Sequence, residues 1–330
     1  MKKMLFFLRK VVFSSEWSWR LYNKMKCFRL DKKIVDKVRK NIGDTTSVYY
    51  VLQRKNNPGS GLCALLNEYL GELRLVDAMG WIPVVDLKSY ANALIDSKYV
   101  GKKNGWDDFF YPMSNVTLEK VESLHNVYYS TVDSHTYCPK WDMRCLNSKK
   151  EIEIWRRLFN KYIRLNDETQ KFVDKEFEKL EKYFVEGVCG VLLRGTDYTE
   201  FKPSGHPIQP TIDEAKVEID KMLKRTGCKY IFLATEDKKI YKELQKIYGN
   251  RIIVDSRKMY DSVNGKTLTN IENRRTDDRY YSTLEYIATL YILSKCKCLV
   301  SGRTSASPII LMLNDDKYDA VYFFELGEYE

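Results

Sequence analysis

The sequence has few residues of the kinds that hold metal ions. Only three histidines and eight cysteines occur among 330 residues, and no two cysteines have the spacing of a CxxC motif. The closest pair, Cys296 and Cys298, stands at a predicted helix-to-strand junction, where small buried thiols are common. A zinc site needs a tighter grouping of ligands. We therefore expect no metal site, and eight reduced thiols in a cytoplasmic protein without a secretory signal.

Long apolar runs, repeats and two common phosphate-binding motifs are also missing. The apolar run at the N-terminus is interrupted by Arg9 and Lys10, so it is too short for a transmembrane helix and lacks the layout of a signal peptide. Neither a G-x-G-x-x-G fingerprint nor a P-loop occurs. These absences leave a folded α/β enzyme or binding protein without an obvious nucleotide motif.

The net charge of +10 is confined to one end of the chain. Residues 1–40 hold 13 Lys and Arg against three acidic residues, and residues 41–330 hold 42 of each sign. A neutral body excludes a general nucleic-acid-binding surface. The segment 1–40 is predicted to be a basic amphipathic arm. Two interpretations remain open: a helix that lies on an anionic membrane face, and a helix packed on the body with its lysines in water.

The first half of the body contains one βαβ pattern. Residues 45–54 alternate and are rich in β-branched and aromatic side chains, which indicates a strand. A loop with Gly59 and Gly61 follows, then leucines at helical spacing from residue 62, then a strand over 81–87. This order predicts a parallel sheet.

The middle of the chain is less regular. We expect a short helix near 117–124, a loop over 130–150, and one or two amphipathic helices over 149–184 that connect two domains.

The second half alternates between strands and helices with short links. Val188 opens a continuous apolar strand, as expected for a strand covered on both faces, and Thr211 with Glu214 forms a capping box. Further strands are expected over 229–235, 251–256, 298–302 and 320–326, and helices over 211–227, 237–249, 282–296 and from residue 304. The fold class is therefore α/β with doubly wound, Rossmann-like domains.

In such sheets, ligands bind beyond the carboxyl ends of the strands. Arg194 and Thr196 follow one strand. The turn 301–307 follows another and combines a glycine, four hydroxyls and an arginine, which suits a phosphate; an ordinary helix cap is the alternative. The donor-binding candidates are Arg194, Thr196, Thr235, Glu236, Asp237, Arg303, Thr304, Ser305, Ser307, Gly59 and Gly61.

The stretch after Arg194 also holds the candidates for a general base. His206 stands between Gly205 and Pro207 in a predicted loop, where it could act as a base or only shape the loop. Asp197 and Glu200 are the other candidates, and the choice among the three stays open.

Three stretches together resemble GDP-fucose-dependent fucosyltransferases of the α-1,6 type, with α-1,2 and protein O-fucosyltransferases as more distant relatives. The stretches are GVLLRGTDY (190–198), YIFLATEDKKIYKELQKIYGNRII (230–253) and TLEYIATLYILSKCKCLVSGRTSAS (283–307). They occur in the order and spacing of that family and cover about the C-terminal 40% of the chain. Gly195 and Tyr198 stand where the core-fucose enzymes tend to have Arg and Lys.

The resemblance implies a GT-B fold of two Rossmann-like domains facing a cleft, with an acceptor side over 41–185 and a donor side over 186–330. It implies an inverting transferase that needs no metal, in which Arg194 binds the β-phosphate of GDP-fucose and Ser305 and its neighbours contact the pyrophosphate. An arginine fork can replace Mg²⁺ at a leaving diphosphate.

The expected reaction is transfer of fucose to an oligosaccharide or lipid-linked glycan in bacterial surface polysaccharide synthesis. The expected location is cytoplasmic, peripheral on the inner membrane face. A GT-B enzyme with another nucleotide sugar and a non-catalytic sugar-nucleotide-binding protein are the alternatives.

Overall fold

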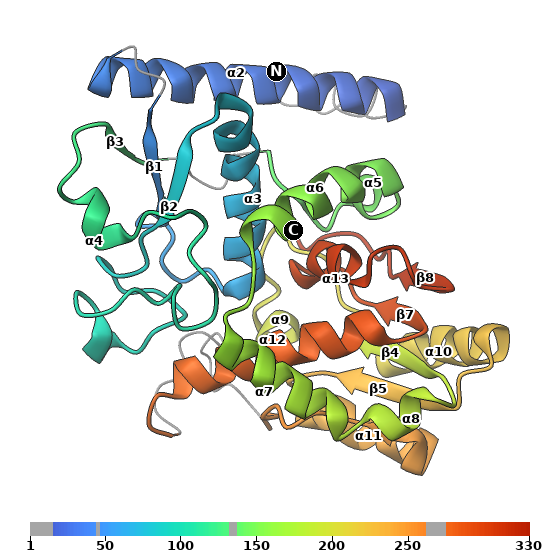
Figure 1. The fold of residues 1–330 in the computed structure, drawn as a ribbon. Coiled ribbons are helices and arrows are strands. Elements are labelled where there is room, and N and C mark those ends of the chain that lie inside the picture. Colours follow the sequence, from blue (N-terminus) through green and yellow to red (C-terminus); the bar gives the residue numbers. More distant parts are fainter. Residues whose placement is uncertain (1–15, 44–46, 132–136, 262–274) are drawn as a thin grey trace. The chain divides into compact units, whose positions relative to one another are not determined.

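The computed structural model describes residues 16–43, 47–131, 137–261 and 275–330, and the segment 1–13 of the predicted arm lies outside them. The chain divides into two compact units (Figure 1). Unit 1 consists of residues 1–57, 66–86 and 112–139, and unit 2 of residues 58–65, 87–111 and 140–330. The predicted domain boundaries at 41 and 186 stay a prediction.

Unit 1 is built on a parallel three-stranded sheet. Its strands β1 (Tyr49–Leu52), β2 (Ile82–Val85) and β3 (Val127–Tyr129) lie in the order β2-β1-β3. Tyr49 is paired with Ile82 on one side and with Val127 on the other. The parallel βαβ pattern predicted from the sequence is confirmed, with α3 (Leu62–Met79) as its helix. Strand β3 was not predicted, because three residues are too few for a clear alternation of apolar and polar side chains.

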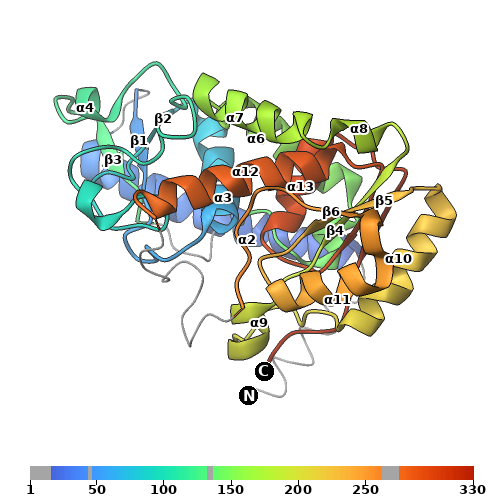
Figure 2. The ribbon, with the colours of Figure 1, turned by 90° about the horizontal axis from the view of Figure 1, so that it is seen from below.

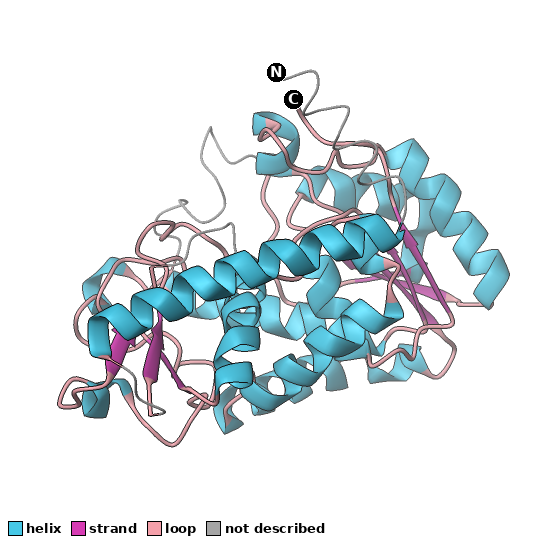
Figure 3. Ribbon diagram, turned by 90° about the horizontal axis from the view of Figure 1, so that it is seen from above, coloured by secondary structure: helices cyan, strands magenta, loops and turns pink. Residues whose placement is uncertain are grey.

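A single long helix, α2 (Glu16–Ile42), forms the N-terminal part of unit 1 and is unbroken (Figure 3). Its inner face buries Ile34 and Val38, and Asp31 on the same face accepts a hydrogen bond from Arg74 of α3 at 2.6 Å. Short helix α4 (Leu118–Val121) is capped by Thr117 and confirms the helix expected near 117–124.

Unit 1 also buries a carboxylate, that of Glu72 on α3. The side chain is 1% exposed. Tyr50 of β1 donates its hydroxyl to Glu72 at 2.8 Å, and Ser130, just beyond β3, donates a second hydrogen bond to the same oxygen. Burial raises the pKa of Glu72 to about 7, although these hydrogen bonds and Arg54 act in the opposite direction.

Unit 2 is built on a parallel five-stranded sheet of strand order β6-β5-β4-β7-β8. The strands are β4 (Val188–Leu192), β5 (Tyr230–Ala234), β6 (Ile252–Ile253), β7 (Cys298–Ser301) and β8 (Ala320–Phe323). The chain starts at the centre, winds outward on one side and then on the other. This is the doubly wound Rossmann order, and its switch point lies between β4 and β7. The predicted α/β class with parallel sheets is confirmed.

Helices cover both faces of this sheet (Figure 2). Helices α10 (Ile212–Thr226) and α11 (Lys238–Tyr248) lie on one face, and α12 (Asp278–Lys295) and α13 (Ala306–Asn314) on the other. Side chains therefore alternate along β4: Cys189 packs with α10 and α11, while Gly190 lies against Leu293 and Cys296 at the end of α12. The capping box of Thr211 and Glu214 and the end of α11 at Gly249 are confirmed.

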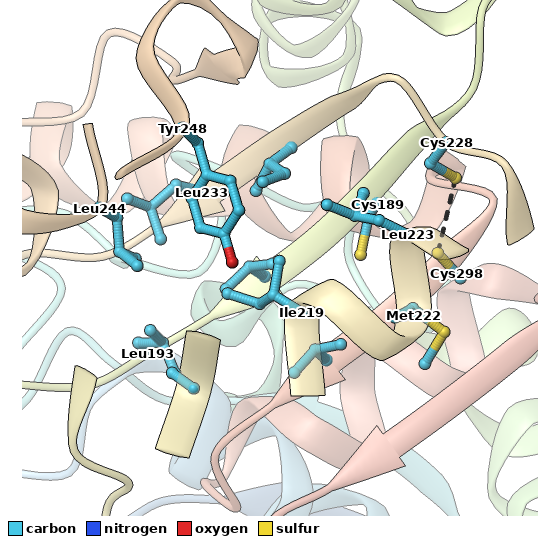
Figure 4. Close-up of a cluster of buried hydrophobic side chains, with 14 of the residues drawn as sticks. Cys189, Leu193, Ile219, Met222, Leu223, Cys228, Leu233, Leu244, Tyr248 and Cys298 are labelled. Carbon is cyan, nitrogen blue, oxygen red and sulfur yellow. Dashed lines mark hydrogen bonds between the residues drawn. The ribbon is translucent and has the colours of Figure 1, made fainter. Parts of the chain in front are cut away.

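The core between β4 and α10 contains three thiols (Figure 4). Cys189, Cys228 and Cys298 are at most 4% exposed, and the sulfurs of Cys228 and Cys298 are 3.7 Å apart. All eight cysteines are free in the structure, and their reduced state in the cell stays a prediction.

The helical content of the middle of the chain was underestimated. The predicted loop over 130–150 contains α5 (Met143–Leu146), which Asp142 caps. The predicted one or two helices over 149–184 are three: α6 (Lys149–Tyr162), α7 (Asp167–Glu178) and α8 (Glu181–Phe184). Helix α6 ends at Tyr162, where Ile163 is extended, and Asn166 then caps the start of α7. Two short 3₁₀ helices, η1 (Ser97–Tyr99) and η2 (Gly249–Arg251), and α9 (Thr196–Phe201) complete the fold.

Candidate functional site

The polar residues that follow β4, β5 and β7 meet at one edge of the unit 2 sheet. In-register pairing places Leu192 beside both Ala234 and Ser301, so the segments that begin at Arg194, Thr235 and Gly302 leave the sheet side by side. This is the edge at which α/β sheets bind ligands. The sequence placed these residues at strand ends, and the sheet order brings the three ends together.

Arg194 is held in place by an ion pair with Glu236. Its Nε lies 3.3 Å from Oε1 of Glu236, and the two side chains are 17% and 1% exposed. The same carboxylate oxygen accepts a hydrogen bond from the backbone of Gly195 at 3.0 Å and from the hydroxyl of Thr196 at 3.2 Å. Glu236 therefore positions the arginine and the turn after it, and its predicted role in donor binding stays a prediction.

Asp237 fixes the other side of the same turn. One of its oxygens accepts from the backbone N–H of Thr196 at 2.9 Å, and the other caps α11. A Cβ on Gly195 would lie 2.2 Å from that carboxylate, so only glycine fits there. Thr196 has φ +40°, which is strained for a β-branched residue. The turn is thus held by the buried carboxylate of Glu236 and the half-buried carboxylate of Asp237, and strained residues held in this way are common at ligand-binding sites.

The turn 301–307 satisfies most of its own polar groups. Thr304 accepts from the backbone N–H of Ala306, and Ser307 accepts from that of Thr304 and donates to the carbonyl of Gly302. Arg303 is buried and donates to the carbonyls of Phe324 and Gly327. Arg303 therefore ties down the C-terminal segment. Its predicted role in donor binding stays a prediction, as do those of Thr304, Ser305 and Ser307.

A pocket in unit 2 opens beside Arg194. Its walls come from the glycine loop, the 257–260 segment and α12, and its lining residues are Gly61, Leu62, Ala93, Leu94, Arg194, Arg257, Lys258, Tyr260, Asp278, Arg279, Ser282, Thr283, Glu285 and Tyr286. The structure thus brings together Arg194 and Gly61, two of the predicted donor-binding residues. Gly59 and the 301–307 turn, which are fully described, are not among the lining residues.

The pocket has an excess of positive charge. It is lined by four cations, Arg194, Arg257, Lys258 and Arg279, and by two carboxylates. Both carboxylates, Asp278 and Glu285, are paired with Arg275, at 3.0 and 2.7 Å. Glu236 is paired with the lining residue Arg194. With Arg275 and Glu236 included, five cations stand against three carboxylates, so the pocket keeps an excess of two positive charges. A diphosphate is the type of ligand that such a cluster favours.

Arg257 and Lys258 are functional candidates that the prediction missed. Arg257 lies 4.4 Å above the ring of Tyr286 on α12, and neither Arg257 nor Lys258 makes an ion pair with a residue that the structure describes. Arg257 directly follows the strand predicted over 251–256, so its position at a strand end was a usable signal. Arg279 had none, because α12 begins four residues before the predicted start.

His206 is connected to Arg194 through the side chain of Tyr198. Its Nδ1 is 3.0 Å from the hydroxyl of Tyr198, and the ring of Tyr198 lies 5.0 Å from the guanidinium of Arg194. Trp141 stacks on the other side of the imidazole at 5.4 Å. Burial lowers the pKa of His206, Glu328 opposes this effect, and Arg194 adds to it. A half-buried, neutral imidazole can accept a proton at pH 7.

The other two base candidates are placed differently. Glu200 is exposed near the end of α9, and among the described contacts none joins it to Arg194, Tyr198 or His206. Asp197 lies in the first turn of α9, and its side chain is not among those described.

Within the described part of the chain, no three His, Cys, Asp or Glu side chains are grouped as metal ligands. None of the described helices is both long and apolar enough to span a bilayer.

The fold resembles those of solved fucosyltransferases. A NodZ α-1,6-fucosyltransferase soaked with GDP-fucose matches with a TM-score of 0.50 and 14% identity, over 85% of this chain and 96% of that one. POFUT1 in complex with GDP matches with a TM-score of 0.50 and 10% identity, over 85% of this chain and 98% of that one. No protein-family model and no curated protein sequence matches the chain. At this identity the likeness is one of fold, and it confirms the resemblance predicted from the sequence.

Proposed function

We propose that this chain is an inverting GT-B glycosyltransferase that transfers fucose from GDP-fucose to a hydroxyl of a glycan. The observation that carries the proposal is Arg194. It lies at the switch point of a doubly wound sheet and lines a cationic pocket with Gly61. The fold of NodZ and POFUT1, whose structures contain GDP-fucose and GDP, supports the choice of donor.

In this proposal the leaving GDP is stabilised by side chains and not by a metal ion. Arg194 takes the β-phosphate, and Arg257 and Lys258 supply the further positive charge along the pocket. A guanidinium offers two parallel N–H donors to phosphate oxygens and stays charged at every relevant pH. The remaining donor candidates, including Thr196, Thr235, Ser305 and Gly59, would shape the rest of the nucleotide site.

The acceptor hydroxyl attacks the anomeric carbon while a base removes its proton. We assign this role to His206 in preference to Glu200 and Asp197. His206 is oriented by Tyr198, whose ring lies against the guanidinium of Arg194. The base and the arginine that binds the phosphate are therefore linked through one tyrosine. If Nδ1 donates to the tyrosine oxygen, Nε2 is left as the proton acceptor.

The proposal also includes the acceptor, the cellular location and the division into domains. The acceptor would be an oligosaccharide or a lipid-linked glycan of a bacterial surface polysaccharide, at the cytoplasmic side of a membrane. Residues 41–185 and 186–330 would form the acceptor and donor domains of a GT-B enzyme.

Nucleotide selectivity tests the donor. We expect GDP to raise the melting temperature of the full chain and UDP and ADP to leave it unchanged. At a GDP concentration of about 100 times Kd, the stabilisation is about 2.7 kcal/mol. Differential scanning fluorimetry with the three nucleotides measures this. Equal shifts would favour a GT-B enzyme with another nucleotide sugar. A GDP shift without turnover of GDP-fucose on any glycan of an acceptor array would favour a non-catalytic binding protein.

Replacement of the base tests the second assignment. We expect His206→Gln to lower kcat of fucosyl transfer by about 10²- to 10⁴-fold, with the Kd for GDP unchanged because the imidazole lies outside the donor pocket. Initial rates and GDP titrations measure the two quantities. Glu200→Gln is the matched control and should retain near wild-type rates. The opposite result, with Glu200→Gln inactive and His206→Gln active, would move the base to α9.

A further inference from the structure

The outer face of α2 exposes large apolar side chains in its first half. Leu21, Met25 and Phe28 follow one another at helical spacing, four and then three residues apart, and are 43%, 52% and 70% exposed. Ile34 and Val38, which are buried, lie on the opposite side of the helix. The three exposed side chains therefore form one stripe that points away from the packed face.

The same outer face is strongly basic in its second half. A shallow groove there is lined by Phe28, Arg29, Lys32, Lys33, Asp36, Lys37 and Lys40, which are five cations and one acid. Lys32 continues the stripe one turn beyond Phe28. Asp31, the nearest other acid, is turned inward to Arg74. No carboxylate other than Asp36 lines the groove to offset the lysines.

We infer that the outer face of α2 docks on an anionic lipid surface. The stripe of Leu21, Met25 and Phe28 would enter the boundary between headgroups and acyl chains, and the basic groove would lie against lipid phosphates. A helix with apolar side chains on one face and flanking Lys and Arg binds an interface in this way, and each basic residue near an anionic membrane adds to the attraction. Charge alone would also suit a nucleic acid, but the aliphatic side chains of Leu21 and Met25 beside Phe28 favour a lipid surface.

This inference goes beyond the donor site and does not depend on it. It commits to an anionic bilayer as the occupant, because the +10 charge of residues 1–40 is complementary to acidic headgroups. A 27-residue helix is about 40 Å long at 1.5 Å per residue, long enough for the apolar stripe and the basic groove to contact the surface at once.

The experiment is co-sedimentation of the full chain with vesicles of phosphatidylcholine alone and of phosphatidylcholine mixed with phosphatidylglycerol, whose anionic headgroups attract Lys and Arg. We expect binding to the anionic vesicles only. Met25→Ser/Phe28→Ser should weaken it about tenfold, by loss of buried apolar surface. Lys32→Gln/Lys33→Gln should also weaken it at least about tenfold. GDP binding should be unchanged in both variants, which keeps this test separate from that of the donor.

Matched controls lie on unit 2. Val217→Ser removes an exposed apolar side chain from α10, and Lys224→Gln/Lys246→Gln removes the same charge from α10 and α11. These variants should bind as wild type. Equal binding to both vesicle types, or equal loss in the control variants, would overturn the inference. So would a concentration-dependent dimer in light scattering that Phe28→Ser abolishes, or a preference for duplex DNA over anionic vesicles.

Discussion

Replacing Arg194 with Ala is expected to lower kcat/KM for GDP-fucose by about 10²- to 10³-fold, or about 3–4 kcal/mol of transition-state stabilisation. The reason is its position at the switch point, where it faces the pocket while its Nε is 3.3 Å from Glu236. Arg194→Lys should restore only part of the rate, because an ammonium cannot donate two parallel hydrogen bonds to a phosphate. Steady-state kinetics with GDP-fucose and an accepted glycan measures both variants.

Stability is the confounding quantity in this experiment. Removal of Arg194 alone leaves the buried carboxylate of Glu236 without its cation, which costs about 3–5 kcal/mol in comparable buried pairs. The double variant Arg194→Ala/Glu236→Gln removes both charges and retains a side-chain oxygen for Gly195 and Thr196. We expect the double variant to have a higher free energy of unfolding than Arg194→Ala and an equally low kcat/KM for GDP-fucose. If the double variant recovered the wild-type rate, Arg194 would have only a structural role.

Glu72→Gln is expected to remove a pH-dependent part of the stability of unit 1. The pKa of this carboxyl is about 7 when folded and 4.5 when unfolded. Below pH 4.5 the carboxyl is protonated in both the folded and the unfolded state, and its contribution to the free energy of unfolding is fully present. That contribution is lost as the pH rises through 7, because the unfolded state then loses its proton more readily than the folded state. At 1.36 kcal/mol per unit of pKa, the loss is about 3 kcal/mol. Urea unfolding of wild type and variant from pH 5 to pH 8 measures it.

The quantity to compare is the difference between the free energies of unfolding of Glu72→Gln and wild type at each pH, because all other groups titrate equally in both proteins. The free energy of unfolding of Glu72→Gln relative to wild type should rise with pH and level off above about pH 8. Glutamine keeps an oxygen for Tyr50 and Ser130, so the hydrogen bonds are retained. Glu122→Gln, at an exposed site of unit 1, is the control and should follow the wild-type curve. A difference between Glu72→Gln and wild type that stays constant over this range would mean that the buried carboxyl does not titrate there.

Much of unit 2 could be predicted because its local signals agree with its tertiary structure. The strand from Val188 is continuously apolar because both faces are covered by helices, and Thr211 caps α10 with contacts only three residues apart. Such features depend on near neighbours in the sequence. The strand ends could therefore be located, and with them Arg194 and the turn that begins at Gly302.

The parts that escaped prediction depend on contacts between distant residues. Helix α9 begins at Thr196 with a positive φ, a conformation held by Glu236 and Asp237 some 40 residues away. Arg257 lines the pocket where it lies over the ring of Tyr286, which α12 supplies, and Lys258 lines it as the next residue along the chain. Glu72 lies within an apolar helix pattern, and only its contacts with Tyr50 of β1 and with Ser130, just beyond β3, show why a carboxylate is tolerated there.

The thiols in the core of unit 2 give the molecule a built-in reporter. Cys189, Cys228 and Cys298 are sealed between β4, β7 and α10, so an alkylating reagent reaches them only when this layer opens. Hydrogen bonding to Cys189, together with burial, also raises the pKa of Cys298 to about 12, and the thiolate is the reactive form. The labelling rate of native protein therefore measures the free energy of opening at the centre of the sheet, and a ligand at the nearby strand ends would slow it in proportion to its occupancy.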